Sequence, residues 1–194
     1  MDRSRLAAMT DGFLAIIITI MVLSLAPPRG AGWSDLRAVG AGVLLYALSF
    51  VYLGIYWNNH HHFFHLVERV SGGLLWANLH LMFWLSLIPF ATAWLGQNPR
   101  AAAPTALYGI LLLLAAVAWW IMEKTALRLQ GAHSRLARAL GRDRKVQFSP
   151  LLYLAGIGLA FWQPWLGDAL YVAAAGLWLI PDRRVERALE GERP

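Results

Sequence analysis

The sequence predicts an all-α membrane protein with six transmembrane helices. Three observations carry this prediction. The 194 residues have a mean hydropathy of +0.49. Only 14% of them are charged, against about 25% in a soluble domain. The apolar residues also form long blocks instead of amphipathic stripes, which is typical of helices that contact lipid.

The apolar blocks predict six spans in a single domain, residues 1–194, because the sequence shows no internal repeat and no low-complexity tract. A bilayer core of about 30 Å takes about 20 residues of helix. The last two blocks are shorter than that, which favours a tight hairpin. We expect the spans at about residues 9–26, 36–58, 74–95, 104–123, 149–163 and 166–180.

The first block has an alternative interpretation as a cleavable secretory signal, because basic residues precede it and "LAPPRGA" follows it. Asp11 stands at the head of this block, and the apolar cores of secretory signals avoid acids. We therefore expect a mature helix.

The one long polar segment is residues 124–147, "KTALRLQGAHSRLARALGRDRKVQ". We expect it to extend the fourth helix into the cytoplasm and then to form a basic linker near anionic headgroups. A regulatory or lipid-binding role is the alternative.

The basic residues predict the orientation. Fourteen of the 17 Lys and Arg fall before the first span, between the second and third, between the fourth and fifth, or after the last. Arg29, Arg37 and Arg100 alone fall on the opposite side. The positive-inside rule then puts both termini in the cytoplasm, as an even number of spans requires. The net charge of +6 is explained as a topology signal, so we expect no nucleic-acid partner.

Polar residues gather at the cytoplasmic ends of the first three spans. Such groups are costly in a membrane and are therefore functional candidates. One cluster opens the first helix, "YWNNHHHFFH" (residues 56–65) ends the second, and Asn78 and His80 lie early in the third. We expect an ion-paired, hydrogen-bonded network that fixes the first helix. Its expected members are Arg5, Thr10, Asp11, Asn58, His61, His62 and Asn78.

Metal and enzyme chemistry are disfavoured. His60, His61, His62 and His65 suggest a metal site, but adjacent helical residues point 100° apart and cannot all converge on one ion. The absence of cysteine excludes thiolate ligands and nucleophiles. No serine elbow, HExxH, Walker loop or intramembrane carboxylate pair is present. We expect no enzyme, no metal and no cofactor. A TVGYG filter and regularly spaced voltage-sensing arginines are also missing.

The first helix carries an apolar stripe with one hydroxyl. At 100° per residue, Thr10 and Asp11 point away from this stripe. The residues that share it are Met9, Gly12, Ile16, Thr19, Ile20 and Leu23. By itself such a stripe is typical of lipid-facing or packing surface.

Two blocks resemble a known family. "RLAAMTDGFLAIIITIMVLSLAPP" (residues 5–28) is similar to the first-helix signature of the bacterial branch of the lysosomal potassium channel family, the transmembrane protein 175 family. That signature has Arg, three residues and Phe-Ser-Asp, where this chain has Met9-Thr10-Asp11. Residues 49–96 resemble the family's second and third helices, with the Tyr-Trp, the His pair and "LLWAN" (residues 74–78) in register.

The resemblance implies a homotetramer whose first helices surround a central cation pore that favours K⁺ and lacks a carbonyl filter. It aligns Ile16 with an isoleucine constriction, Thr19 with a hydroxyl one turn on, and Ile20 and Leu23 with further hydrophobic rings. An unbroken helix has no free backbone carbonyls for an ion, and an isoleucine ring closes a pore by dewetting it.

Two rivals stay open. One is a proton-conducting or pH-sensing channel of the same architecture, because histidines titrate near physiological pH. The other is a non-conducting membrane scaffold or metalloenzyme that uses the histidine cluster. Arginine outnumbers lysine 15 to 2 and no organelle address is visible, so we expect a multi-pass protein of a bacterial plasma (inner) membrane.

Overall fold

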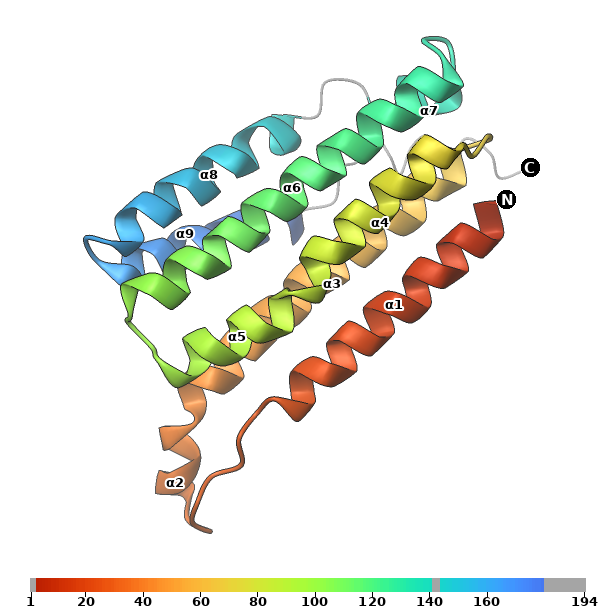
Figure 1. Ribbon diagram of the computed structural model, residues 1–194. Helices are drawn as coiled ribbons and strands as arrows, with labels where there is room; N and C mark the ends of the chain where they lie inside the picture. The colour runs from red at the N-terminus through yellow and green to blue at the C-terminus, as the bar shows by residue number, and fades with distance from the viewer. Residues whose placement is uncertain (1–2, 141–143, 180–194) are drawn as a thin grey trace.

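The computed structural model describes residues 3–140 and 144–179, and its regular structure is helical throughout, which confirms the all-α class (Figure 1). The helices of this described part are α1 (Arg3–Leu23), α2 (Trp33–Ala38), α3 (Gly40–Leu66), α4 (Gly72–Ser86), α5 (Ile88–Gln97), α6 (Ala102–Gln130), α7 (Arg135–Leu140), α8 (Arg144–Ala160) and α9 (Pro164–Leu179).

Among the described residues, four segments are long and apolar enough to cross a membrane: α1, α3, the rod of α4 and α5, and α6. The last two helices, α8 and α9, have 17 and 16 residues and pack as an antiparallel hairpin against α6 (Figure 1). The expected spans lie on these helices. α3 runs past the expected end of its span at 58 as far as Leu66. α6 continues past 123 to Gln130, in agreement with the expected extension of the fourth helix.

Local chemistry explains where the helices begin and end. The hydroxyl of Ser71 caps α4 by accepting the Leu74 N–H at 3.2 Å. Pro89 lacks an N–H, so the segment expected as one span at 74–95 breaks at Leu87 into α4 and α5. The last residue of α6 is Gln130, and the next residue, Gly131, caps the helix with a φ of 90°, which suits a residue without a Cβ.

The long helices lie alongside one another (Figure 1). The start of α1, the end of α3, the start of α4, the end of α6 and helix α7 lie at one end of the molecule, here called the inner end. Helix α2 and the end of α5 lie at the opposite, outer end (Figure 1).

The inner end is tied together by polar contacts to backbone groups. The Gln130 side chain donates to the Arg69 carbonyl at 2.7 Å and accepts the N–H groups of Glu68 and Arg69 at 3.3 Å. Arg69 Nη2 donates to the Leu129 carbonyl at 2.7 Å. These bonds join α6 to the loop between α3 and α4. The expected linker, residues 124–147, thus begins as an extension of α6 and continues through α7; residues 141–143 and 180–194, with the last four arginines, lie outside the described part.

Candidate functional site

Helix α1 has a buried back and an exposed front. The back packs against α3, α4 and α5, and its buried residues are Leu6, Thr10, Leu14, Ile17 and Met21. The front carries the six residues of the expected stripe, all exposed. Exposure reaches 60% at Ile16 and 83% at Leu23. The other described helices of the chain therefore leave this stripe uncovered, from Met9 to Leu23.

Thr19, in the middle of the front, donates its hydroxyl proton to the Ile16 carbonyl at 2.9 Å. A hydroxyl has one proton to donate and two lone pairs that accept. With the proton engaged in the helix, the oxygen presents its lone pairs outward. The front of α1 therefore has one acceptor between Ile16 and Ile20.

Behind α1, near the inner end, three buried side chains form a hydrogen-bonded chain. Thr10 donates to the Leu6 carbonyl at 3.2 Å and accepts from Asn78 Nδ2 at 3.0 Å. His60 Nε2 lies 2.9 Å from Asn78 Oδ1. Because a carboxamide oxygen only accepts, His60 carries its proton on Nε2 in this bond. The chain joins α1, α4 and α3, and all three residues are at most 1% exposed.

The structure brings Thr10 and Asn78 together as expected, but other members of the expected network lie elsewhere. Arg5 and Asn58 are exposed and have no hydrogen-bond or ion-pair partner among the described residues. The contact with the end of α3 that was expected of Arg5 is made by Arg3. Arg3 donates to the carbonyls of His65 and Val67 at 3.4 and 3.2 Å. The reason is helical phase: Leu6 and Thr10 point inward, so Arg5 points out.

The histidines divide in the same way. His60 points inward, whereas His61 is exposed, lies 3.2 Å from His65 between their Nε2 atoms and stacks on Trp57. His62 is half-buried, edge-on to His61. Successive residues rotate by 100°, so one histidine of the run reaches Asn78. Within the described ranges, no group of three or more His, Asp or Glu side chains is placed to hold a metal ion.

Asp11 belongs to a separate contact on the flank of α1. Its Oδ1 accepts from Trp57 Nε1 at 3.0 Å, and both side chains are exposed. It therefore links α1 to α3 without joining the buried chain of Thr10, Asn78 and His60.

A second buried polar chain, which the sequence analysis missed, lies toward the outer end. Thr92 lies 2.8 Å from the Ile88 carbonyl, 2.7 Å from the Ser49 hydroxyl and 3.9 Å from Met21 Sδ. Ser49 is also 2.9 Å from the Tyr108 hydroxyl. Isolated hydroxyls in apolar blocks were the available signal. This chain joins α6, α3 and α5 and contacts the back of α1.

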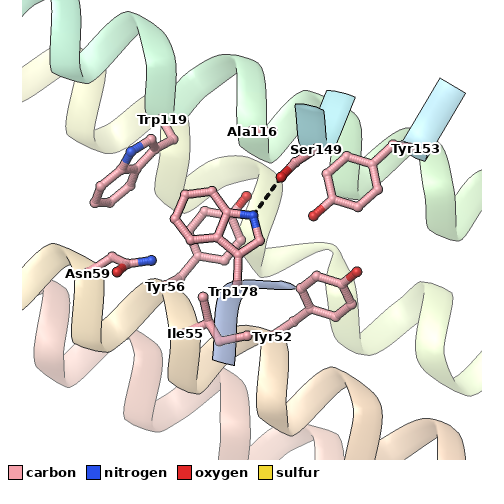
Figure 2. A pocket seen from close by; sticks show the side chains of 9 residues that line it. All are labelled: Tyr52, Ile55, Tyr56, Asn59, Ala116, Trp119, Ser149, Tyr153 and Trp178. Atoms are coloured by element: carbon pink, nitrogen blue, oxygen red, sulfur yellow. Dashed lines mark hydrogen bonds between the residues drawn. The ribbon is translucent and has the colours of Figure 1, made fainter. Parts of the chain in front are cut away.

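Aromatic side chains line a small cavity between α3, α6, α8 and α9 (Figure 2). Trp178 Nε1 donates to Ser149 Oγ at 2.6 Å across it. The cavity has a volume of about 30 Å³, enough for one or two water molecules. It is too small for a hydrated cation.

A family model and several relatives match this chain in sequence. The family model "Endosomal/lysosomal potassium channel TMEM175" matches residues 5–89. This range holds the buried chain of Thr10, His60 and Asn78, and all of α1 except its first two residues. A potassium channel of Chryseobacterium sp. (strain P1-3) is 47% identical over 190 residues, covering 98% of this chain and 99% of the relative. A potassium channel of Streptomyces collinus is 30% identical, covering 91% and 89%.

A solved structure has the same fold. It is the crystal structure of a lysosomal potassium-selective channel TMEM175 homolog from Chamaesiphon minutus, which superposes with a TM-score of 0.79 at 26% identity and covers 92% of this chain and 96% of that one. With a family model over its first three long helices and a 47% identical relative along nearly its whole length, the chain belongs to the endosomal/lysosomal potassium channel TMEM175 family, a family of channels and not of enzymes.

Proposed function

We propose that this protein is a potassium-favouring cation channel in which four copies of the chain place the front of α1 around a central pore. The observation that carries the proposal is the division of α1 into a buried back and an exposed front that contains Ile16, Thr19, Ile20 and Leu23. The potassium-channel names of the 47% and 30% identical relatives support K⁺ as the permeant ion.

Ile16 is the proposed gate. Four isoleucine side chains at one level form a narrow apolar ring that excludes water and therefore cations. Ile20 and Leu23 form further rings toward the outer end. The pore opens when α1 tilts or rotates enough for water to enter the rings.

Thr19 is the proposed polar step between the rings. Its proton is held by the Ile16 carbonyl, so its oxygen faces the path as an acceptor for a partly dehydrated cation. The backbone carbonyls along the middle of α1 are engaged within the helix and are not available to an ion. Four hydroxyls are a flexible set of ligands, and selectivity for K⁺ over Na⁺ is therefore modest.

The remaining parts of the proposal follow from topology. The chain forms a single six-span domain with the inner end in the cytoplasm, in the plasma (inner) membrane of a bacterium. The positive-inside rule supports this orientation, since Arg3, Arg5, Arg69, Lys124 and Arg128 all belong to segments at the inner end. Apart from the permeant ion, the channel uses no cofactor.

The test is potassium flux from liposomes that contain purified protein. Ile16→Asn is expected to wet the ring and to raise the flux about tenfold, the effect of lowering a barrier by about 1.4 kcal/mol. The matched control is Leu44→Asn, which adds the same amide at an exposed apolar position of α3. Equal flux from wild type and Ile16→Asn would refute the gate, and a reversal potential that follows the proton gradient would replace K⁺ by H⁺ as the permeant ion.

A further inference from the structure

A cavity of about 370 Å³ lies behind the outer end of α1. It is open on one side and is bordered by the last turn of α1, the start of α3 and the end of α5, with Met21, Ser24, Gly42, Ala93 and Gly96 among its lining residues. It therefore touches the back of the helix whose front carries Ile20 and Leu23.

The lining suits a narrow hydrocarbon chain. The side chains are mostly small and apolar, and a Cβ on Gly42 would meet nothing within 4 Å. A Cβ on Gly96 would lie 3.2 Å from the Gly42 Cα, so α3 and α5 approach closely and close the cavity on that side. The hydroxyls of Ser24 and Thr92 in this lining donate to the carbonyls of Ile20 and Ile88, and Gln97 is exposed. An acyl chain therefore fills the space without burying an unpaired hydroxyl.

Three arginines flank, in sequence, the segments that line the cavity. Arg37 directly precedes the lining residue Ala38, Arg100 directly follows Pro99, and Arg29 is three residues beyond Ala26. All three are exposed and have no hydrogen-bond or ion-pair partner within residues 3–140 and 144–179. The one nearby acid, Asp35, accepts the Gly32 N–H at 2.9 Å. The three arginines on the side opposite the proposed cytoplasmic side thus stand beside the chain segments that border the cavity.

We propose that this cavity binds an anionic phospholipid of the outer leaflet, with the phosphate at Arg37 and Arg100 and one acyl chain beside Met21 and Gly42. Arginine forks match phosphate oxygens. The consequence for gating rests on the proposed function: the chain occupies the space into which the outer end of α1 moves when the rings widen, so the bound lipid holds the pore closed.

Binding is tested by native mass spectrometry of the protein with phosphatidylglycerol or phosphatidylcholine. Wild type is expected to retain phosphatidylglycerol selectively. Arg37→Gln with Arg100→Gln is expected to weaken retention about fivefold for each arginine, and Gly42→Leu is expected to weaken it by filling the cavity. The matched controls are Lys124→Gln with Arg128→Gln at the inner end, and Gly158→Leu, another glycine with open space around its Cβ.

Four results overturn the proposal. Equal losses in the inner-end pair would indicate general charge attraction. Loss in the arginine pair with full retention in Gly42→Leu would indicate a headgroup contact without an acyl chain. Displacement by excess inorganic phosphate would indicate a phosphate site. A lower oligomer mass of Gly42→Leu with unchanged lipid retention would indicate that a second copy of the chain fills the cavity.

Flux separates this proposal from the proposed function. In liposomes, added phosphatidylglycerol is expected to lower potassium flux through wild type and to have less effect on Gly42→Leu. Lipid retention without any change in flux would leave the site and refute its regulatory role. No flux from wild type or Ile16→Asn in any lipid would refute the channel, while the retention measurements would still decide the lipid site.

Discussion

Asn78 connects three helices through one carboxamide. Its Nδ2 donates to Thr10 on α1, and its Oδ1 accepts from His60 on α3. The amide is suited to this position because it has both donors and acceptors without a charge. In apolar surroundings, a buried polar group that loses its partner costs more than the bond itself contributed. Asn78 therefore fixes the rotation and depth of α1 relative to the other helices.

Asn78→Ala is expected to lower the free energy of unfolding by about 1–3 kcal/mol, because the His60 N–H loses its acceptor. The lower figure is nearer to values measured for hydrogen bonds between membrane helices. Asn58→Ala makes the same change at an exposed position and is expected to stay within about 0.5 kcal/mol of wild type. Equilibrium unfolding in mixed micelles measures both. Equal losses in the two variants would contradict a special role for Asn78.

Some residues of the buried polar network can be identified from the sequence, and others cannot. Thr10 and Asn78 are identifiable because a polar residue in an apolar block stands out, and the spans place both at one depth. The choice of His60 over its neighbours depends on the rotation of α3. The buried positions Ser49, Leu53, His60 and Phe64 follow a helical period. However, α3 has apolar residues on every face, so the sequence pattern does not show which face is buried. The same reasoning explains why Arg3, and not Arg5, reaches the end of α3.

Helix α1 is held differently at its two ends. The inner end has the Arg3 bonds to backbone carbonyls and the bond from Asn78 to Thr10. The outer end has Met21 beside the Thr92 hydroxyl, a contact of 3.9 Å to a weakly accepting sulfur. Thr92 has one proton, and the Ile88 carbonyl at 2.8 Å is its stronger acceptor. We therefore expect the outer half of α1 to move more readily than the inner half.

Thr92→Val is expected to loosen the outer half of α1 selectively. It removes the hydroxyl beside Met21 and the acceptor of Ser49 while it keeps the shape of the side chain. Amide hydrogen exchange at residues 17–23 is expected to become about threefold faster, the effect of one weak bond between membrane helices. Residues 3–10 keep their rate. Thr125→Val, which removes a hydroxyl bonded within α6 alone, is the control. Faster exchange along all of α1 would contradict a fixed inner end.

The centres of the helices were predictable from the sequence, and their ends were not. Long apolar blocks locate α1, α3, α6 and the rod of α4 and α5. The break at Leu87 had a visible signal in Pro89, which the expected span 74–95 overlooked. The polar run 56–65 was expected at the end of the second helix, but its polar composition does not show at which residue the helix stops. The surrounding helices decide it, since His60, Phe63 and Phe64 are buried against them.

The sequence determines the orientation of the chain in the membrane more firmly than it determines the number of spans. The distribution of arginines predicts the orientation without any knowledge of packing. The number of spans depends on α8 and α9, whose 17 and 16 residues extend about 24–26 Å, somewhat less than a core of about 30 Å. A hairpin of this length crosses the membrane only with little tilt. The assembly of four chains remains part of the proposal: it rests on family resemblance, and the exposed front of α1, which no described residue covers, is compatible with it.

Accessibility of single cysteines tests the six-span topology, because the chain has no cysteine of its own. Ala31→Cys precedes α2, Ala132→Cys lies between α6 and α7, and Gln163→Cys lies in the turn between α8 and α9; all three positions are exposed. In intact cells, a membrane-impermeant maleimide is expected to label the first and third variants, and the second only after permeabilisation. Labelling of Gln163→Cys only after permeabilisation would leave four spans, and the converse pattern for the first two would invert the orientation.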